Sequence, residues 1–246
     1  MSVDVTDLRA FYNGPLGAVT QRLVGRNLHR FLGSVAGLRV LGLGYAVPYL
    51  GPVRHAAERT LAFMPATQGV VNWPAAGRSA SALVDPTMMP LPEAAVDRVI
   101  LVHAIEAVES PADLLQEVWR ILTPGGRLVL VVPNRRGLWA RRDATPFGHG
   151  QPYSRSQLGR LMRETLFSPE GWAETLYVPP VESWLTLRTA SAWERVGTGL
   201  SLPFAGLHVV DAIKQLHRPV TVQARRAARL ATPVLVPSPA PVPGGV

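Results

Sequence analysis

The sequence predicts an α/β protein built on a doubly wound, mostly parallel sheet. Residues 97–103 and 127–133 each contain an unbroken apolar run, which is typical of parallel strands covered on both faces. Between them, residues 111–122 carry apolar side chains at helical spacing behind the cap sequence Ser110-Pro111. A strand, helix, strand alternation of this kind indicates parallel pairing with right-handed crossovers.

The other elements follow from apolar spacing and from the positions of Gly and Pro. Two helices are expected within residues 6–36, separated at Asn13-Gly14-Pro15, and residues 134–153 form a long Arg- and Gly-rich loop, typical of a lid or binding loop. Strands are expected at 38–43, 60–64, 82–85, 97–103, 127–133, 174–178 and 207–213, and the later helices at 48–58, 111–122, 154–166 and 182–195.

Length and composition indicate one large domain with additions at both ends. With 246 residues, 47% of them hydrophobic, the chain can bury one substantial core. We expect an N-terminal helical extension over 1–36, a main domain over 37–220, and a basic, then Pro- and Ala-rich tail over 221–246 without packed structure. The absence of Cys excludes disulfides, thiolate zinc sites and Cys nucleophiles, and no metal site is predicted.

The net charge of +8 is a weak indication of a nucleic-acid partner. Lys214 is the only lysine, and the excess of Arg, Ala, Pro and Val is typical of a GC-rich genome. One local exception is the cluster Arg135, Arg136, Arg141 and Arg142, where Trp139 could either stack on an aromatic ligand or fill the core. No apolar run reaches the ~20 residues of a membrane span, and no signal peptide is recognisable, so a cytoplasmic protein is expected.

The apolar run 38–43 ends at Gly42 and Gly44, just before a segment that can begin a helix. Glycines at this place let the backbone approach a ligand, and the next helix offers free N–H groups. The third glycine of a dinucleotide fingerprint would fall at Val47, so the motif alone does not identify the ligand.

Four segments together resemble the class I S-adenosylmethionine-dependent methyltransferases, in particular the methyltransferase type 11 group. They are Val-Leu-Gly-Leu-Gly-Tyr at 40–45, Asp85 with the Pro-Leu-Pro-to-Val run at 90–99, Leu-Thr-Pro-Gly-Gly-Arg-Leu at 122–128, and Gly-Leu-His-Val-Val-Asp-Ala at 206–212. The resemblance covers roughly residues 36–215. It implies a single Rossmann-like domain with a seven-stranded sheet, N-terminal helices and a late antiparallel strand.

The same resemblance implies S-adenosylmethionine as cofactor and locates its site. Gly42, Gly44 and Tyr45 would line the methionine and ribose portion, while Asp85, followed by Pro86, would accept a hydrogen bond from the adenine amino group. Asp85 could equally serve only to form the turn before Pro86. The family's ribose-binding acid has no counterpart, because Met64 stands in its place, and Gly42 replaces another acid.

Candidates for catalysis are His103, at the end of the strand 97–103, and His149 with Tyr153 in the long loop. A histidine exchanges protons near neutral pH, which suits an acceptor that must lose a proton. For each of them a packing role is the alternative: a strand-end histidine bonded to backbone, and a surface loop docked by Phe147 and Tyr153.

We therefore expect a methyltransferase acting on an unidentified acceptor, more readily a small molecule than a nucleic acid, and without a membrane partner. The alternative is a catalytically weak or inactive protein of the same fold that acts as an interaction or regulatory module. A nicotinamide-dependent oxidoreductase shares the fold, but it would also need a third glycine and a ribose acid. The acceptor and the oligomeric state are not determined by the sequence.

Overall fold

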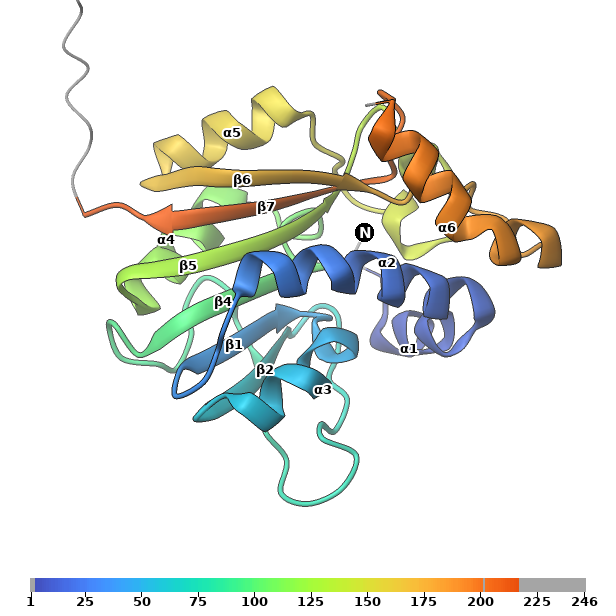
Figure 1. The fold of residues 1–246 in the computed structure, drawn as a ribbon. Helices are drawn as coiled ribbons and strands as arrows, with labels where there is room; N and C mark the ends of the chain where they lie inside the picture. Colours follow the sequence, from blue (N-terminus) through green and yellow to red (C-terminus); the bar gives the residue numbers. More distant parts are fainter. Residues whose placement is uncertain (1–2, 201, 217–246) are drawn as a thin grey trace, which may run out of the picture.

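A computed structural model describes residues 3–200 and 202–216, which form a seven-stranded sheet flanked by helices (Figure 1). The strand order is β3-β2-β1-β4-β5-β7-β6, and β7 runs antiparallel to both of its neighbours while the other pairs are parallel. The strands are β1 Arg39–Gly44, β2 Arg59–Pro65, β3 Ser81–Val84, β4 Val96–Val102, β5 Leu122–Pro133, β6 Phe167–Thr175 and β7 Leu207–Lys214. The expected mostly parallel sheet with a late antiparallel strand is confirmed.

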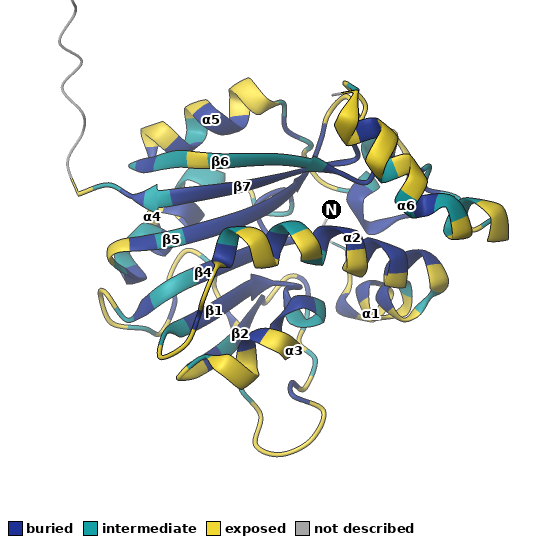
Figure 2. Cartoon of the chain, in the orientation of Figure 1, coloured by how far each residue is buried: buried dark blue, intermediate teal, exposed yellow. Residues whose placement is uncertain are grey.

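Each face of the sheet has its own hydrophobic core, because successive residues of a strand point to opposite sides. One core joins Val40 and Ile100 to helices α1, α2 and α3, and the other joins Leu41 and Val99 to α4 and α5. In Figure 2 the central strands are buried along most of their length. The helices are α1 Val5–Asn13, α2 Pro15–Leu32, α3 Val47–Ala56, α4 Pro111–Ile121, α5 Arg155–Glu164 and α6 Trp184–Gly199.

The carboxyl ends of the parallel strands meet at one edge of the sheet, where α1 also lies (Figure 1). There the N–H of Tyr45 donates to the carbonyl oxygen of Val102 at 2.8 Å, so the end of β1 is tied to the end of β4. Ligands of open α/β sheets generally bind at this edge.

Two expected elements differ from those observed. β6 covers Phe167–Thr175 instead of 174–178, and Ser168-Pro169, which follow the expected helix at 154–166, lie inside the strand. β6 is an edge strand with a register shift between Pro169 and Gly171, and both features allow a proline that no central strand would accept. β5 also begins earlier than expected, since Leu122 already pairs with Val96 of β4.

The loop 134–153 is held in place by two short 3₁₀ turns, η1 Trp139–Arg141 and η2 Pro146–Gly148. Its ends are joined by a bridge between Asn134 and Tyr153. The expected tail over 221–246 lies outside the described residues. Within residues 3–200 and 202–216, no helix has both the length and the apolar character needed to cross a bilayer.

Candidate functional site

His103 is the residue immediately after β4, at the edge where the parallel strands end. Its φ of 52° is left-handed, a conformation that histidine adopts more readily than most side chains and that turns the chain sharply away from the strand. The ring is buried, packs against the tilted ring of Phe147 at 4.4 Å between ring centroids, and places Nε2 3.0 Å from the hydroxyl of Tyr12. Nδ1 points to Glu106, whose Oε1 is 3.5 Å away.

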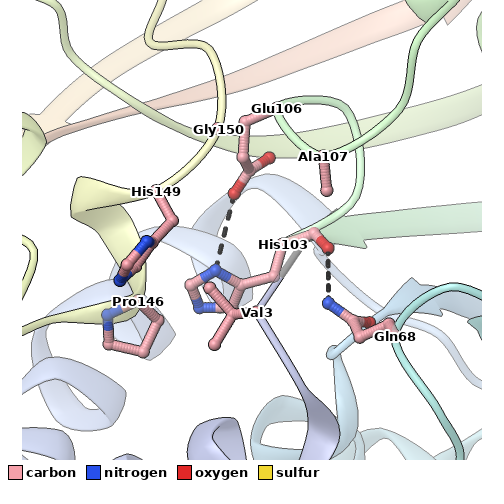
Figure 3. Close-up of a pocket in the computed structure, with 8 residues that line it drawn as sticks. All are labelled: Val3, Gln68, His103, Glu106, Ala107, Pro146, His149 and Gly150. Carbon is pink, nitrogen blue, oxygen red and sulfur yellow. Dashed lines mark hydrogen bonds and ion pairs between the residues drawn. The ribbon is translucent and has the colours of Figure 1, made fainter. Parts of the chain in front are cut away.

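Glu106 is a buried carboxylate beside a small cavity of about 10 Å³ (Figure 3). Neither of its oxygens accepts a hydrogen bond from a described residue. The Oε1 of the neighbouring Gln68 also accepts no hydrogen bond from a described residue. Gln68 donates through Nε2 to the carbonyl oxygen of His103 at 3.1 Å. Three acceptor oxygens without donors therefore surround one cavity, and buried polar groups of this kind call for a partner.

Helix α1 and the segment ahead of it close this edge of the sheet. The Val5 N–H donates to the carbonyl oxygen of Gln68 at 2.8 Å, and Val3 lines the cavity itself. Further along α1, the hydroxyl of Tyr12 contacts Tyr49 at 3.2 Å as well as His103, so the helix is anchored directly to the site. Asp4 caps the helix by accepting from the Thr6 N–H at 2.7 Å.

The two glycines at the end of β1 are required by packing of the protein against itself. A Cβ at Gly42 would lie 2.8 Å from side-chain atoms of Ala46, the N-cap of α3, and of Leu50 on that helix. Gly44 has a φ of 80°, and a Cβ there would lie 2.2 Å from the carbonyl oxygen of Val102. Tyr45 is buried and stacks on Tyr12 at 5.6 Å, and burial raises the pKa of its hydroxyl.

The other residues assigned to the cofactor lie at the ends of β2 and β3. Met64 is fully buried, and its Sδ accepts the Val71 N–H at 3.4 Å. Asp85 is exposed, and its carboxylate accepts from the Thr87 hydroxyl at 2.7 Å and from the Thr87 N–H at 2.8 Å. The hydroxyl bond lowers the pKa of Asp85. Both bonds use Oδ1, so Asp85 closes a turn across Pro86, while its role toward the adenine amino group stays a prediction.

The loop candidates divide between the cavity and the core. His149 lines the cavity with His103 and holds the carbonyl oxygen of Asp143 at 2.9 Å. Tyr153 is buried with an unpartnered hydroxyl, and burial together with the charge of Glu106 raises its pKa to about 12. Phe147 is also buried, so the loop is docked at both places we expected.

Trp139 has a core role, because it is fully buried and its Nε1 donates to the carbonyl oxygen of Val178 at 2.8 Å. It packs against Phe147, the ring that covers His103, and so supports the site from behind. Stacking on a ligand, the alternative we considered, is contradicted by this burial. The four arginines of the loop, 135, 136, 141 and 142, are exposed.

Sequence reasoning missed three residues of this cluster: Tyr12, Gln68 and Glu106. Glu106 had a signal, since an acid three residues after a strand-end histidine can fold back on it. Gln68 and Tyr12 had none, because their position depends on how α1 packs over the sheet edge. Within the described residues, no group of three or more His, Asp or Glu side chains is arranged to hold a metal ion.

A second hollow of about 450 Å³ lies between β7, β6 and the start of α5. His208 lines it and is buried, with neither ring nitrogen hydrogen-bonded to a described residue. Burial lowers the pKa of His208 to about 4. Glu174, 3.6 Å from Nδ1, would favour the charged ring, but its carboxylate is one-third exposed and the solvent weakens that attraction.

Comparisons with known proteins agree with this geometry. A family model described as a methyltransferase domain matches residues 42–130. A probable S-adenosylmethionine-dependent methyltransferase of Mycolicibacterium smegmatis is 33% identical over 84 residues, which are 33% of this chain and 32% of the relative. The chain thus matches about a third of the length of that curated relative.

Two solved structures share the fold at low identity. Geranyl diphosphate C-methyltransferase from Streptomyces coelicolor A3(2), solved with Mg²⁺, geranyl diphosphate and S-adenosyl-L-homocysteine, has a TM-score of 0.56 and 17% identity over 77% of this chain and 76% of its own. The cyclase SpnF has a TM-score of 0.57 and 18% identity over 80% and 81%.

The sheet order, the site at the carboxyl edge and these likenesses define a class I S-adenosylmethionine-dependent methyltransferase fold. The matched segment includes the glycines at the end of β1, the end of β4 and the start of β5. Within that fold, residues 42–130 match the methyltransferase domain family, and the similar relative is a probable S-adenosylmethionine-dependent methyltransferase.

The residues beside His103 fit S-adenosylmethionine in chemistry, but the cavity between them does not leave it room while α1 is docked. The cofactor carries hydroxyl and ammonium donors, and Gln68 and Glu106 offer unpartnered acceptor oxygens at the expected edge. The cavity beside them is about 10 Å³, whereas small-molecule sites occupy about 300–1,000 Å³. The segment from Val3 to Tyr12 is what closes the edge.

Proposed function

We propose that the protein is an S-adenosylmethionine-dependent methyltransferase acting on a small-molecule acceptor that loses a proton as it is methylated. The observation that carries this proposal is the buried His103–Glu106 pair at the end of β4, with carboxylate oxygens that no described residue satisfies. When bound, the cofactor supplies an electrophilic methyl group. The chain must then hold the acceptor and remove its proton.

The geometry suggests a role for each side chain. Glu106 takes the acceptor's proton on a carboxylate oxygen, because those oxygens face the cavity and are free of other donors. His103 positions that carboxylate: Nδ1–H faces Glu106, while Nε2 accepts from the Tyr12 hydroxyl. His149, half-exposed on the same cavity, can pass the proton on to solvent. Gln68 would hold a hydroxyl of the cofactor through its Oε1.

Calorimetry of the full chain with S-adenosylmethionine and S-adenosylhomocysteine tests the proposal. We expect binding of both, because the product keeps the same hydroxyl and ammonium groups. Glu106→Gln should keep the site's shape, yet methyl transfer in a screen of small-molecule acceptors should fall by at least about tenfold. Absence of any binding at millimolar cofactor would refute the proposal.

A second test asks whether α1 must leave the edge before the cofactor enters. Asp4→Ala removes the N-cap of α1, which costs about 1 kcal/mol, so the association rate of the cofactor should rise about fivefold. Ser154→Ala removes the cap of α5 and serves as the matched control, with an unchanged rate expected. Equal rates in both variants would show that α1 does not limit entry.

The alternative function is a non-catalytic interaction or regulatory module of the same fold. The closed cavity and Met64 in place of the ribose-binding acid favour it. The same calorimetry separates the two functions, since the module would bind neither form of the cofactor.

A further inference from the structure

The hollow between β6, β7 and the start of α5 contains a buried histidine without a hydrogen-bond partner. His208 is 3% exposed and lines the hollow, yet neither ring nitrogen bonds to a described residue. Because burial lowers the pKa of His208 to about 4, the ring is neutral near pH 7 and carries one N–H donor and one lone pair. Buried polar atoms normally have a partner, so this ring indicates that a polar molecule occupies the hollow.

Two exposed arginines line the same hollow and have no acidic partner. They are Arg136, in the loop after β5, and Arg155, the first residue of α5. No carboxylate among the described residues lies within ion-pair distance of either guanidinium. The Arg155 guanidinium lies 4.9 Å from the ring of Trp172, and its charge contributes to the low pKa of His208. The positive charge of Arg155 therefore acts on the interior of the hollow.

The start of α5 adds to this positive side. Ser154 and Ser156 line the hollow, and their hydroxyls lie 3.1 Å apart. The first turn of α5 contains no acidic side chain, so its N-terminal N–H groups and the helix dipole meet no negative charge there. An anionic group in the hollow would be stabilised by the helix start and by both arginines.

The hollow also has a negative side. Of the described residues that line it, Glu174 alone carries a carboxylate. Its Oε1 lies 3.6 Å from Nδ1 of His208, and its Oε2 accepts from the Tyr177 hydroxyl at 3.4 Å. The carboxylate is one-third exposed and can accept a further hydrogen bond from a ligand. The hollow thus offers two cations, one anion and a neutral imidazole.

We propose that this hollow binds a free α-amino acid, with its carboxylate at the two arginines and its ammonium group at Glu174 and His208. Such a zwitterion gives every charged group of the lining an opposite charge, and its ammonium supplies a donor for the imidazole lone pair. A phosphate or a simple carboxylate would meet the like charge of Glu174, and a polyamine would meet the arginines. The volume of about 450 Å³ lies within the about 300–1,000 Å³ of small-molecule sites. The proposal does not depend on methyl transfer.

Thermal unfolding of the full chain with added L-amino acids tests this assignment. Each common amino acid is added separately at ~10 mM, because a ligand that binds only the folded state raises the melting temperature. At least one amino acid should raise it. Acetate and methylammonium, which each carry only one of the two charges, should leave it unchanged at the same concentration. Calorimetry then gives the dissociation constant of the amino acid with the largest effect.

Substitutions on the two sides of the hollow should act differently. Arg155→Gln should raise the dissociation constant of that amino acid about tenfold or more. Glu174→Gln should raise it by a similar factor, yet it should strengthen the binding of acetate, because a like charge is removed. The matched controls are Arg160→Gln on α5 and Glu170→Gln on β6, which change exposed side chains that do not line the hollow. Their dissociation constants should stay within about twofold of the parent, since solvent screens these charges.

Three outcomes would overturn the proposal. One is that no amino acid raises the melting temperature. Another is that acetate or inorganic phosphate binds the parent as tightly as the best amino acid, or that Glu174→Gln strengthens amino-acid binding, because the hollow would then be a site for anions alone. The third is displacement of the bound amino acid by S-adenosylhomocysteine, since the hollow would then hold the amino-acid portion of the cofactor.

Discussion

Replacing Tyr12 by Phe should destabilise the fold by about 1–5 kcal/mol. The hydroxyl of Tyr12 is buried and serves two partners, His103 Nε2 at 3.0 Å and the Tyr49 hydroxyl at 3.2 Å. Each buried partner left without its hydrogen bond costs about 1–3 kcal/mol, and about 1 kcal/mol is recovered because the variant no longer buries a hydroxyl of its own. The net effect is therefore a lower free energy of unfolding for Tyr12→Phe.

Urea unfolding of both proteins measures this difference. The matched control is Tyr45→Phe. The Tyr45 ring stacks on Tyr12, but the Tyr45 hydroxyl has no hydrogen bond to a described side chain. The free energy of unfolding of this variant should therefore differ from that of the parent by less than about 0.5 kcal/mol. If Tyr12→Phe and Tyr45→Phe gave the same free energy of unfolding, the anchoring of α1 through His103 would be wrong.

Three further predictions concern the loop and its surroundings. Gly150→Ala should destabilise by at least about 2 kcal/mol in urea, because φ is 78° and the new Cβ would lie 2.3 Å from the Glu106 carbonyl oxygen; Gly33→Ala, with φ of 60° and open space, should cost clearly less. Tyr153→Phe should leave the free energy of unfolding unchanged or raise it by up to about 1 kcal/mol, since its buried hydroxyl lacks a partner; a loss above about 1 kcal/mol would show that a hidden partner exists. His208 stays neutral when folded but gains a proton when unfolded, so stability should be complete above about pH 6.5 and fall by about 3 kcal/mol as pH drops toward about 4. His208→Gln should remove that part of the acid loss, and an unchanged pH profile would contradict the burial argument.

The central strands could be predicted because burial on both faces leaves a continuous apolar run in the sequence. β1, β4 and β5 all carry that signal. β6 does not carry it, because the strand is half-buried at the edge of the sheet. It also contains Pro169, and a proline in this position does not indicate a strand in the sequence. The edge position is a property of the assembled sheet, and no short segment of sequence reports it.

The site was predictable only where chemistry and chain position coincide. His103 could be found because it ends a buried strand, and His149 because a histidine between glycines in a long loop is unusual. Glu106 and Gln68 gain their meaning from a shared cavity formed by segments far apart in the chain, and Asp85 was ambiguous because turns and ligands both use its carboxylate. The packing of α1, which brings Tyr12 to His103, could not be predicted from the spacing of apolar residues in the sequence.

The position of Val3 on the cavity has a practical consequence for anyone who purifies this protein. A purification tag joined ahead of Val3 would emerge at the mouth of the proposed reaction centre, and the Val5 N–H that holds Gln68 lies only two residues further on. Such a tag could hold α1 open or block the edge, so a binding measurement on tagged material would report the tag as much as the protein. Preparations with and without the tag should therefore be compared before a negative result is taken as the absence of activity.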